Sequence, residues 1–422
     1  MKSFFRRLIA KRLERSVVRL VRANPRLKLI AVGGSVGKTS TKLAIATVLA
    51  QKYRVLVHEG NYNSELGLPL SLFELEVPTR ITDVVGWLRL LGAVEHKLSR
   101  PFPYDVAVLE LGTDRPGDIP HFMTYLKPDI GLVTAITPEH MANFGSLEAV
   151  AEEEFGLLLG SQTAILHVND PELAKRQKLL GAKPVRTYGE AGHVHWTDSD
   201  NLCLGADLGT IQLKPQILGA HSRLALLAAA SVGVQLNVGV IQIAHGLNGV
   251  VSVPGRMQRL RGKDSTALID DTYNSSPDAV FAALKTLKHM TRGRRIAVLG
   301  QMNELGDYSL EAHTAVGRAA ADLDLLITIG HDANTILGPS AVAAGLAKGK
   351  WQHFDSSFAA GEWLADRTKN GDTILFKGSQ NGVFAEEAIK PLLADPADAA
   401  RLVRQSQFWL DLKVKQFGVQ SR

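Results

Sequence analysis

Residues 28–41 read KLIAVGGSVGKTST, an apolar run followed by a glycine-rich turn and a segment of helical character. This order is typical of a phosphate-binding loop, in which backbone N–H groups at a helix N-terminus face an anion. Lys38 is expected to reach the terminal phosphates, and the Thr39 hydroxyl stands where a magnesium ion would bind. The stretch therefore predicts ATP as the energy source. The alternative is a glycine-rich turn without a ligand, but turn chemistry alone seldom places Lys-Thr after the glycine.

The loop is shorter than the standard phosphate-binding pattern. In that pattern four residues separate the first glycine from the Gly-Lys pair, and the position of that first glycine is occupied here by Val32. A compressed form beginning at Gly34 fits instead. The residues that we expect to bind the nucleotide here are Gly34, Ser35, Gly37, Lys38, Thr39 and Ser40.

Composition places the chain among globular proteins of two or three domains, because it has 422 residues, 45% of them hydrophobic and 21% charged. No apolar run reaches the length of about 18 residues that suggests a membrane span. The single cysteine, Cys203, excludes a disulfide framework and cysteine-based metal sites. It also fits a reducing compartment, so we expect a cytoplasmic protein.

The basic charge is concentrated at the N-terminus. Residues 1–28 contain ten basic residues and one acid, which is a net charge of +9. Because the whole chain has a net charge of +6, the other residues together carry −3. Apolar residues recur there at spacings of three and four between the arginines, and this predicts a basic amphipathic helix over residues 1–27. The segment lacks the apolar core of a signal peptide. Three interpretations stay open: a surface helix packed on the first domain, a helix in peripheral contact with an anionic inner membrane face, or a nucleic-acid-binding segment.

Two series of strands and helices follow. Apolar strands are expected at 53–58, 105–111, 130–136 and 163–168, and a second set at 266–270, 295–300, 325–330 and 373–378. Continuous apolar strands separated by helices predict parallel sheets that are covered on both faces. We expect an α/β protein with the basic helix at 1–27, a central phosphate-loop domain at 28–253, a Rossmann-like C-terminal domain at 254–395 and a helical tail at 396–422.

Polar residues gather where the predicted strands end, and the carboxyl ends of parallel strands share one edge of a sheet. Glu110 stands where a magnesium ligand belongs, with a capping acid as the alternative. His140 follows the next apolar strand. The acids Glu152, Glu153 and Glu154 would by themselves be a solvated helix face. The expected substrate contacts are Asn61 and Asn63 in the first domain, and Glu304, Lys377 and Ser379 in the second, where Asp271 and Asn274 form a further polar cluster.

Taken together, these elements resemble the Mur ligase family, and within it the MurF type. Eight elements match in order between residues 28 and 395. They are the loop at 34–39, GNYNSELGLPLS at 60–71, Glu110-Leu111-Gly112, the His140 loop with 144–146, Pro254-Gly255-Arg256, the segment 271–274, the segment 302–306 and Lys377-Gly378-Ser379.

The resemblance implies an ATP-dependent acid–amino-acid ligase that acts in peptidoglycan synthesis, and so in cell-wall biogenesis and cell shape. ATP would phosphorylate a substrate carboxylate, and the amine of D-alanyl-D-alanine or of another amino acid or dipeptide would attack the acyl phosphate. By the same resemblance Lys38 would stabilise the transferring phosphoryl group. Thr39 and Glu110 would hold one Mg²⁺, and His140 would help to hold a second. Arg256, Asp271 and Asn274 would contact the nucleotide.

Three departures from the family pattern bear on the substrate and the metal. The position of the family's carbamylated lysine, fourteen residues after His140, holds Glu154, whose carboxylate we expect to replace the carbamate. The GxHNxxN motif keeps only its first half at 219–223. Only the basic helix stands where the family has a UDP-holding domain. The acceptor is therefore a peptidoglycan precursor, a lipid-linked precursor or another polymer of the poly-amino-acid type. A non-catalytic nucleotide-binding subunit is the alternative from a different class.

Overall fold

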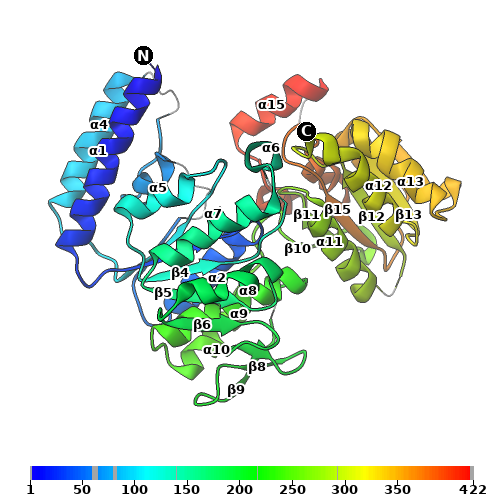
Figure 1. The fold of residues 1–422 in the computed structure, drawn as a ribbon. Coiled ribbons are helices and arrows are strands. Elements are labelled where there is room, and N and C mark those ends of the chain that lie inside the picture. The colour runs from blue at the N-terminus through cyan, green and yellow to red at the C-terminus, as the bar shows by residue number, and fades with distance from the viewer. Residues whose placement is uncertain are drawn as a thin grey trace. The chain divides into compact units, whose positions relative to one another are not determined.

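The computed structural model describes residues 2–58, 65–78, 83–138, 140–215, 217–291 and 293–418. The chain forms two compact units (Figure 1). One comprises Met1–Gln216 with Ser222–Val250, and the other Ile217–His221 with Val251–Arg422. Among the described residues, none of the helices combines the length and the hydropathy that crossing a membrane requires.

The first unit is built on a six-stranded sheet in the order β2-β3-β1-β4-β5-β6, with every pair parallel. Its strands are β1 Lys28–Gly33, β2 Val55–Val57, β3 Val106–Glu110, β4 Ile130–Val133, β5 Thr163–His167 and β6 Val185–Tyr188. The strands are almost wholly apolar because helices bury both faces of the sheet. β1 lies between β3 and β4, so the segments that follow these three strands emerge side by side.

The helices of the first unit are α1 Lys2–Ala23, α2 Lys38–Leu49, α3 Gly67–Leu72, α4 Val84–Leu98, α5 Asp118–Tyr125, α6 Met141–Phe144, α7 Leu147–Gly160, α8 Pro171–Arg176, α9 Ala220–Gln235 and α10 Val240–Asn248. A small antiparallel sheet of β7 His195–Trp196, β8 Asn201–Cys203 and β9 Thr210–Gln212 accompanies them. The side chain of Arg223 stacks on Trp196 of this sheet, with its guanidinium 3.7 Å from the ring centre.

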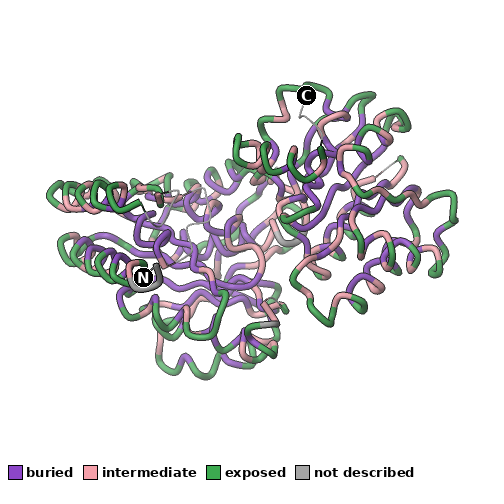
Figure 2. Tube along the Cα trace, turned by 90° about the horizontal axis from the view of Figure 1, so that it is seen from above, coloured by how far each residue is buried: buried purple, intermediate pink, exposed green. Residues whose placement is uncertain are grey.

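The basic helix α1 is part of the core of the first unit. Its apolar side, which includes Leu13 and Val17, is buried in the same cluster as Trp87 and Val94 of α4 and Phe122 of α5. Figure 1 shows α1 lying beside α4, and Figure 2 shows that the outer sides of both helices are exposed. Of the three interpretations of this segment, the packing therefore supports a surface helix docked on the first domain, with its basic side toward solvent.

The second unit holds a six-stranded sheet in the order β10-β11-β15-β12-β13-β14. Its strands are β10 Gln258–Arg261, β11 Ala267–Asp271, β12 Arg295–Gly300, β13 Leu325–Ile329, β14 Trp351–Phe354 and β15 Thr373–Lys377. Within this sheet, as far as the structure describes it, only the edge pair β10–β11 is antiparallel. The expected α/β architecture, with a phosphate-loop domain followed by a Rossmann-like domain, is confirmed.

The helices of the second unit are α11 Pro277–Met290, α12 Ser309–Ala319, α13 Gly338–Ala343, α14 Ser357–Ala365 and α15 Gln407–Phe417. Its short 3₁₀ turns lie at Lys263–Ser265, Gly306–Tyr308, Lys348–Lys350, Ala385–Ala388, Lys390–Leu392 and Pro396–Arg401, and a π-helical turn at Ala333–Leu337 precedes α13. A further 3₁₀ turn, Gln177–Leu180, belongs to the first unit. The tail is packed onto this unit, since Trp409 and Phe417 of α15 both contact the ring of Phe384.

The packing of α1 predicts that this helix supports the stability of the first unit. Leu13→Ala should lower the free energy of unfolding by about 2–5 kcal/mol, because it leaves a cavity at a fully buried position. Leu8→Ala, on the exposed side of the same helix, should change it by less than about 0.5 kcal/mol. Urea unfolding followed by circular dichroism measures both. Equal effects of the two variants would show that α1 does not belong to the core.

Candidate active site

The loop after β1 depends on two glycines in the left-handed backbone region. Gly34 has φ 111° and Gly37, which caps the N-terminus of α2, has φ 85°. A Cβ atom on Gly34 would lie 2.3 Å from Thr134 Oγ1, so a larger residue has no room there. The loop therefore presents the open N–H groups at the start of α2, which is the arrangement that binds phosphate.

The segment after β4 holds the loop in place. The Ser35 backbone N–H donates to the carbonyl oxygen of Ala135 at 2.7 Å. The Ser35 hydroxyl accepts from the Thr137 N–H at 3.0 Å and donates to the Thr137 carbonyl at 3.1 Å. The Thr134 hydroxyl donates to the carbonyl of Val36 at 2.6 Å. The Ser35 side chain thus fixes the shape of the loop.

Lys38 folds back over this loop. Its ammonium donates to the carbonyl oxygen of Gly34 and, at 3.3 Å, to that of Ser35. The next two residues of the motif, Thr39 and Ser40, continue into the first turn of α2, where Thr39 is buried and Ser40 half-buried. The lysine is therefore held at the phosphate loop.

Glu110, at the end of β3, meets the first turn of α2. The Thr39 hydroxyl donates to Glu110 Oε1 at 3.1 Å, so the structure brings these two expected magnesium ligands together. The ammonium of Lys42 lies 3.0 Å from Oε2, and only 2% of its side chain is exposed. Sequence reasoning missed Lys42. The signal was present, because a residue three positions after Thr39 lies on the same helix face.

Glu154 of α7 points at the phosphate loop and is fully buried. Its Oε2 accepts the Gly34 backbone N–H at 2.6 Å, and a Cβ atom on Gly33 would meet this oxygen. Burial raises the pKa of the Glu154 carboxyl, and the nearby Lys38 charge opposes that rise. Oε1 accepts no hydrogen bond from the residues that the structure describes. A buried carboxylate oxygen of this kind is available to a cation.

The expectation of a solvated acidic run at 152–154 is wrong for two of its three residues. Glu153 is buried and accepts the backbone N–H groups of Gly117 at 2.9 Å and Ile119 at 2.7 Å, near the start of α5. Glu154 is buried at the phosphate loop, and Glu152 is exposed. A helix that packs on both a sheet and a neighbouring helix cannot keep three consecutive side chains in water.

His140 stands in the left-handed region, with φ 49°, directly before α6. Its Nε2 lies 3.6 Å from Oδ1 of Asp114, in the segment that follows β3. The Asn143 amide donates to the Asp114 carbonyl at 2.9 Å and reinforces this link. The histidine therefore reaches the segment after Glu110, as the strand order predicted, and its recorded ionic neighbour is Asp114.

The donor set of this site fits Mg²⁺. Glu110 and Thr39 offer a carboxylate and a hydroxyl side by side, and Glu154 adds the buried Oε1. The described residues contain no group of three or more His, Cys, Asp or Glu side chains that could hold a metal by themselves. Mg²⁺ usually takes one or two carboxylates together with waters and substrate phosphates, so a sparse set of oxygen ligands beside a phosphate loop suits it.

In the second unit, an ion pair lies where β11 and β15 end. Asp271 and Lys377 are register partners, and their Oδ2 and Nζ atoms are 2.6 Å apart. Lys377 also donates to the carbonyl of Asn274 at 2.9 Å. The guanidinium of Arg256 lies 4.2 Å from the centre of the Tyr273 ring. Four of the residues expected at this edge, Arg256, Asp271, Asn274 and Lys377, are therefore close to one another.

Two further substrate candidates, Ser379 and Glu304, follow the ends of β15 and β12. The Ser379 hydroxyl accepts the backbone N–H of Asn303 at 2.8 Å, which ties the end of β15 to the end of β12. Glu304 is exposed and has φ 64°. Asn61 and Asn63 lie outside the described residues.

The C-terminal tail supports the loop at 272–274. Arg404 donates to the carbonyls of Thr272 at 2.6 Å and Tyr273 at 3.0 Å, and it forms two hydrogen bonds with the buried Glu386. Lys413, also buried, lies 2.9 Å from Glu386. The sequence predicted a helical tail at 396–422 but gave no sign of this cluster, because nothing in the local pattern pairs charges so far apart along the chain.

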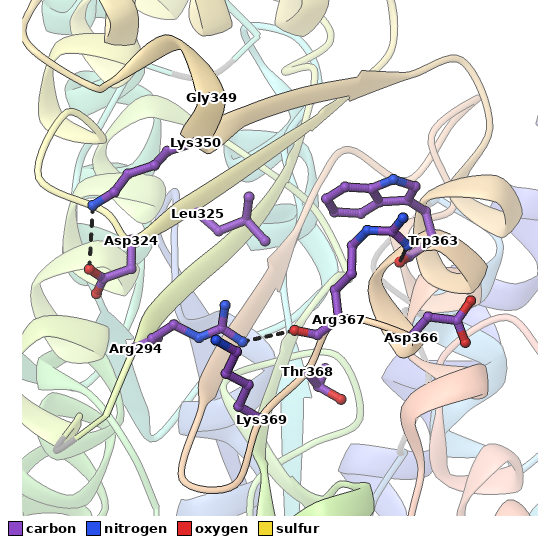
Figure 3. A pocket seen from close by; sticks show the side chains of 10 residues that line it. All are labelled: Arg294, Asp324, Leu325, Gly349, Lys350, Trp363, Asp366, Arg367, Thr368 and Lys369. Atoms are coloured by element: carbon purple, nitrogen blue, oxygen red, sulfur yellow. Dashed lines mark hydrogen bonds and ion pairs between the residues drawn. The ribbon is translucent and has the colours of Figure 1, made fainter.

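A pocket of about 460 Å³ lies at the opposite edge of the second sheet, near the amino ends of β12, β13 and β14 (Figure 3). Several of the charged side chains that line it have partners within the unit. Lys350 pairs with Asp324, and Arg294 donates to the Arg367 carbonyl and pairs with Asp372. This pocket is separate from the strand ends that carry the candidate residues, so we assign it no part in the site.

The buried cluster of the tail predicts a large effect of one arginine. Arg404→Met should destabilise the second unit by on the order of 3 kcal/mol, because it removes two bonds to Glu386 and leaves that carboxylate buried with one fewer cation. Arg401→Met, at an exposed arginine in the same segment, should change stability by less than about 0.5 kcal/mol. Thermal unfolding compares the two. Equal melting temperatures for both variants would contradict a structural role for the cluster.

The comparisons with known proteins agree with this geometry. Residues 32–84 and 94–233 match the Mur ligase middle domain, and residues 255–380 match the Mur ligase, glutamate ligase domain. The UDP-N-acetylmuramoyl-tripeptide–D-alanyl-D-alanine ligase of Synechocystis is 33% identical over 377 residues, covering 87% of this chain and 75% of that protein. The Escherichia coli ligase of the same name is 28% identical over 392 residues, with 88% and 78% covered.

Solved structures of similar fold include MurF from Acinetobacter baumannii, with a TM-score of 0.73 at 24% identity, covering 94% of this chain and 80% of that one. The MurF ligase from Thermotoga maritima in complex with ADP has a TM-score of 0.69 at 25% identity, with 92% and 84% covered. The matched domains, the relatives at up to 33% identity and the phosphate loop beside Glu110 lead to one conclusion: this chain belongs to the Mur ligase family.

Proposed function

We propose that this chain is an ATP-dependent carboxylate–amine ligase of the MurF type, which adds D-alanyl-D-alanine to a UDP-N-acetylmuramoyl-tripeptide. Relatives that carry this activity in their names support the proposal. The observation that carries the proposal is the contact of Glu110 with both Thr39 and Lys42 beside the phosphate loop. Such a group serves phosphoryl transfer, because it combines a phosphate cradle with an oriented carboxylate.

The proposed reaction has two steps. A carboxylate oxygen of the acceptor attacks the γ-phosphorus of ATP, the bond to ADP breaks, and an acyl phosphate forms. The amine of the dipeptide then attacks the acyl carbon, phosphate leaves, the nitrogen loses a proton, and an amide remains. Lys38 and the N–H groups at the start of α2 stabilise the charge on the transferring phosphoryl group.

Bound Mg²⁺ would supply neutralisation of the phosphate charge. We propose Thr39 and Glu110 as ligands of one ion, and His140 with Glu154 as ligands of a second. The ion pair with Lys42 holds one oxygen of Glu110, while the other oxygen accepts the Thr39 hydroxyl. The open Oε1 of Glu154 supports its role, since an unsatisfied buried carboxylate oxygen is costly unless a ligand uses it.

The second unit is proposed to bind the nucleotide through Arg256, Asp271 and Asn274. The stacking of Arg256 on Tyr273 and the bond from Lys377 to the Asn274 carbonyl support this role, since they preshape one polar surface at the strand ends. We propose Glu304, Lys377 and Ser379, with Asn61 and Asn63, as contacts of the acceptor or the dipeptide. The domain bounds 1–27, 28–253, 254–395 and 396–422 remain our proposal.

We place the enzyme in the cytoplasm, with residues 1–27 in peripheral contact with the inner membrane face. The single cysteine and the exposed basic side of α1 support this location. A membrane location would also suit a lipid-linked acceptor, which is the second candidate for the substrate.

Phosphate release tests the activity. With ATP, Mg²⁺, D-alanyl-D-alanine and the UDP-linked tripeptide, release should require both the amine and the acceptor. Lys38→Met should lower kcat by at least about 10²-fold, because it removes a donor to the transferring phosphoryl group. Lys52→Met, at an exposed lysine just after α2, is the matched control and should retain activity. Release only with lipid-linked or unrelated acceptors would support the other ligases, and ATP binding without turnover would favour a non-catalytic subunit.

A second experiment tests the role of Glu154. Glu154→Gln keeps the size of the side chain and an acceptor for the Gly34 N–H, but it loses the charge. We expect at least about a tenfold fall in kcat, because a neutral amide is a poorer Mg²⁺ ligand than a carboxylate. Glu152→Gln, at the exposed acid of the same helix, should leave activity unchanged.

Bicarbonate gives this second experiment a further readout. The wild-type enzyme should be indifferent to bicarbonate, whereas Glu154→Lys should gain activity when bicarbonate is added, since the lysine can then form a carbamate. Near-normal activity of Glu154→Gln would refute the proposed replacement.

A further inference from the structure

The helices α1 and α4 run side by side in the same direction. Arg12 and Arg19 of α1 both pair with Glu95 of α4, at 3.0 and 2.8 Å. Each helix leads from its C-terminal end into a strand of the same sheet, and the first residues of those strands, Lys28 and Val106, are register partners. The N-terminal ends of the two helices therefore lie together at the other end of the pair, as Figure 1 shows.

Apolar side chains are exposed at this shared end. Leu8 of α1 and Val84, Val85 and Leu88 of α4 are between 52% and 65% exposed. The ion pairs of Glu95 with Arg12 and Arg19 fix the relative level of the two helices. On α4, Leu88 lies seven residues before Glu95. On α1, Leu8 lies seven residues before Arg15, the position midway between the two arginines. Two leucines on adjacent parallel helices are thus about two turns from the same bridge and at the same level.

Exposed basic residues run along the two helices, and Arg6, Arg7, Lys11 and Arg89 lie in the turns next to the apolar end. The exposed basic residues of the two helices are Arg6, Arg7, Lys11, Arg12, Arg15, Arg19, Arg22 and Arg89. The acids nearby have partners within the unit. Glu14 pairs with His121, Glu95 with the two arginines, and Asp83 caps α4 by accepting the Gly86 N–H at 2.8 Å. The outer surface of the helix pair therefore carries a net positive charge.

We propose that this end of the α1–α4 pair, which we call the helix-pair tip (Leu8, Val84, Val85 and Leu88 with the basic residues around them), binds the surface of an anionic lipid bilayer. An anionic bilayer can bind both the exposed aliphatic side chains and the basic residues. The aliphatic side chains enter the interfacial region while the arginines and lysines contact lipid phosphates. Nucleic acid would match the charge but gain nothing from four exposed aliphatic side chains. The inference deepens the proposed location and assigns the contact to two helices rather than to residues 1–27 alone.

The structure also shows how the contact differs from that of a simple amphipathic helix. The apolar stripe of α1 that includes Leu13 and Val17 is buried in the core, so it is not available to lipid. Among the side chains that the structure describes on the two helices, the exposed apolar ones at this end are Leu8 and those of α4. The first unit would then sit end-on at the membrane, with the two N-terminal helix ends toward the lipid.

Cosedimentation of the full chain with vesicles tests the proposal. We expect binding to vesicles of phosphatidylcholine with phosphatidylglycerol, weak binding to phosphatidylcholine alone, and loss of binding as salt is raised. The double variant Leu8→Gln/Leu88→Gln should bind anionic vesicles at least about tenfold more weakly. Ile241→Gln, at an exposed isoleucine elsewhere on the first unit, is the matched control and should bind like the wild type.

Phosphate release in solution separates this inference from the proposed activity. The Leu8→Gln/Leu88→Gln variant should keep the wild-type ligase rate, because neither leucine lies near the phosphate loop. Absence of binding to anionic vesicles, equal binding of the double variant and the wild type, or binding to nucleic acid in place of vesicles would each overturn the proposal. If the protein binds vesicles but shows no ligase activity, the membrane proposal is supported and the proposed function is refuted.

Discussion

The pairing of β1 with β3 on one side and with β4 on the other is the constraint on which the candidate site of the first unit depends. Because the three strands are parallel and in register, the phosphate loop, Glu110 and the segment 134–140 emerge next to one another. The loop can then hydrogen-bond to the segment after β4 while α2 presents Thr39 to the end of β3. No single segment could build this arrangement, since each supplies only one of the groups that phosphoryl transfer needs.

Each unit contains buried carboxylates, but the two units differ in how fully those carboxylates are bound by cations and hydrogen-bond donors. The buried Glu386 carboxylate pairs with Arg404 and Lys413 of the tail, and Arg404 also donates to the carbonyl of Thr272. The cluster therefore fixes the position of the tail and of the loop at 272–274. Burial also raises the pKa of the neighbouring Asp270 to about 6, while its carboxylate ties Gly255 to Thr272. At Glu154 the balance is incomplete, because one oxygen accepts a loop N–H and the other has no hydrogen bond among the described residues. Burying a carboxylate without a full set of partners costs free energy of folding. The position of Glu154 beside the phosphate loop therefore indicates a site that a bound cation completes.

The sequence predicted the parts of the fold that rest on local pattern. Apolar strands, the compressed glycine loop and the polar residues at strand ends are visible because period, turn chemistry and strand polarity are local properties. Glu153 and Arg404 could not be assigned in that way. Each is a charged residue that is buried through a partner far along the chain, and composition alone reads such residues as exposed. The placement of His140 beside Asp114 depends similarly on two loops that only the strand order brings together.

The N-terminal helix shows why periodicity alone leaves its role open. An apolar stripe with arginines between its members serves equally to pack against a domain or to lie in a lipid interface. Here the stripe is buried against α4 and α5, so the same residues cannot also meet lipid. The arginines that flank the stripe bind Glu95 or face solvent, and the exposed leucine at position 8 has its counterpart on α4 rather than along α1. A surface that could contact a membrane therefore arises from the pairing of two helices, and neither helix carries it in its own sequence pattern.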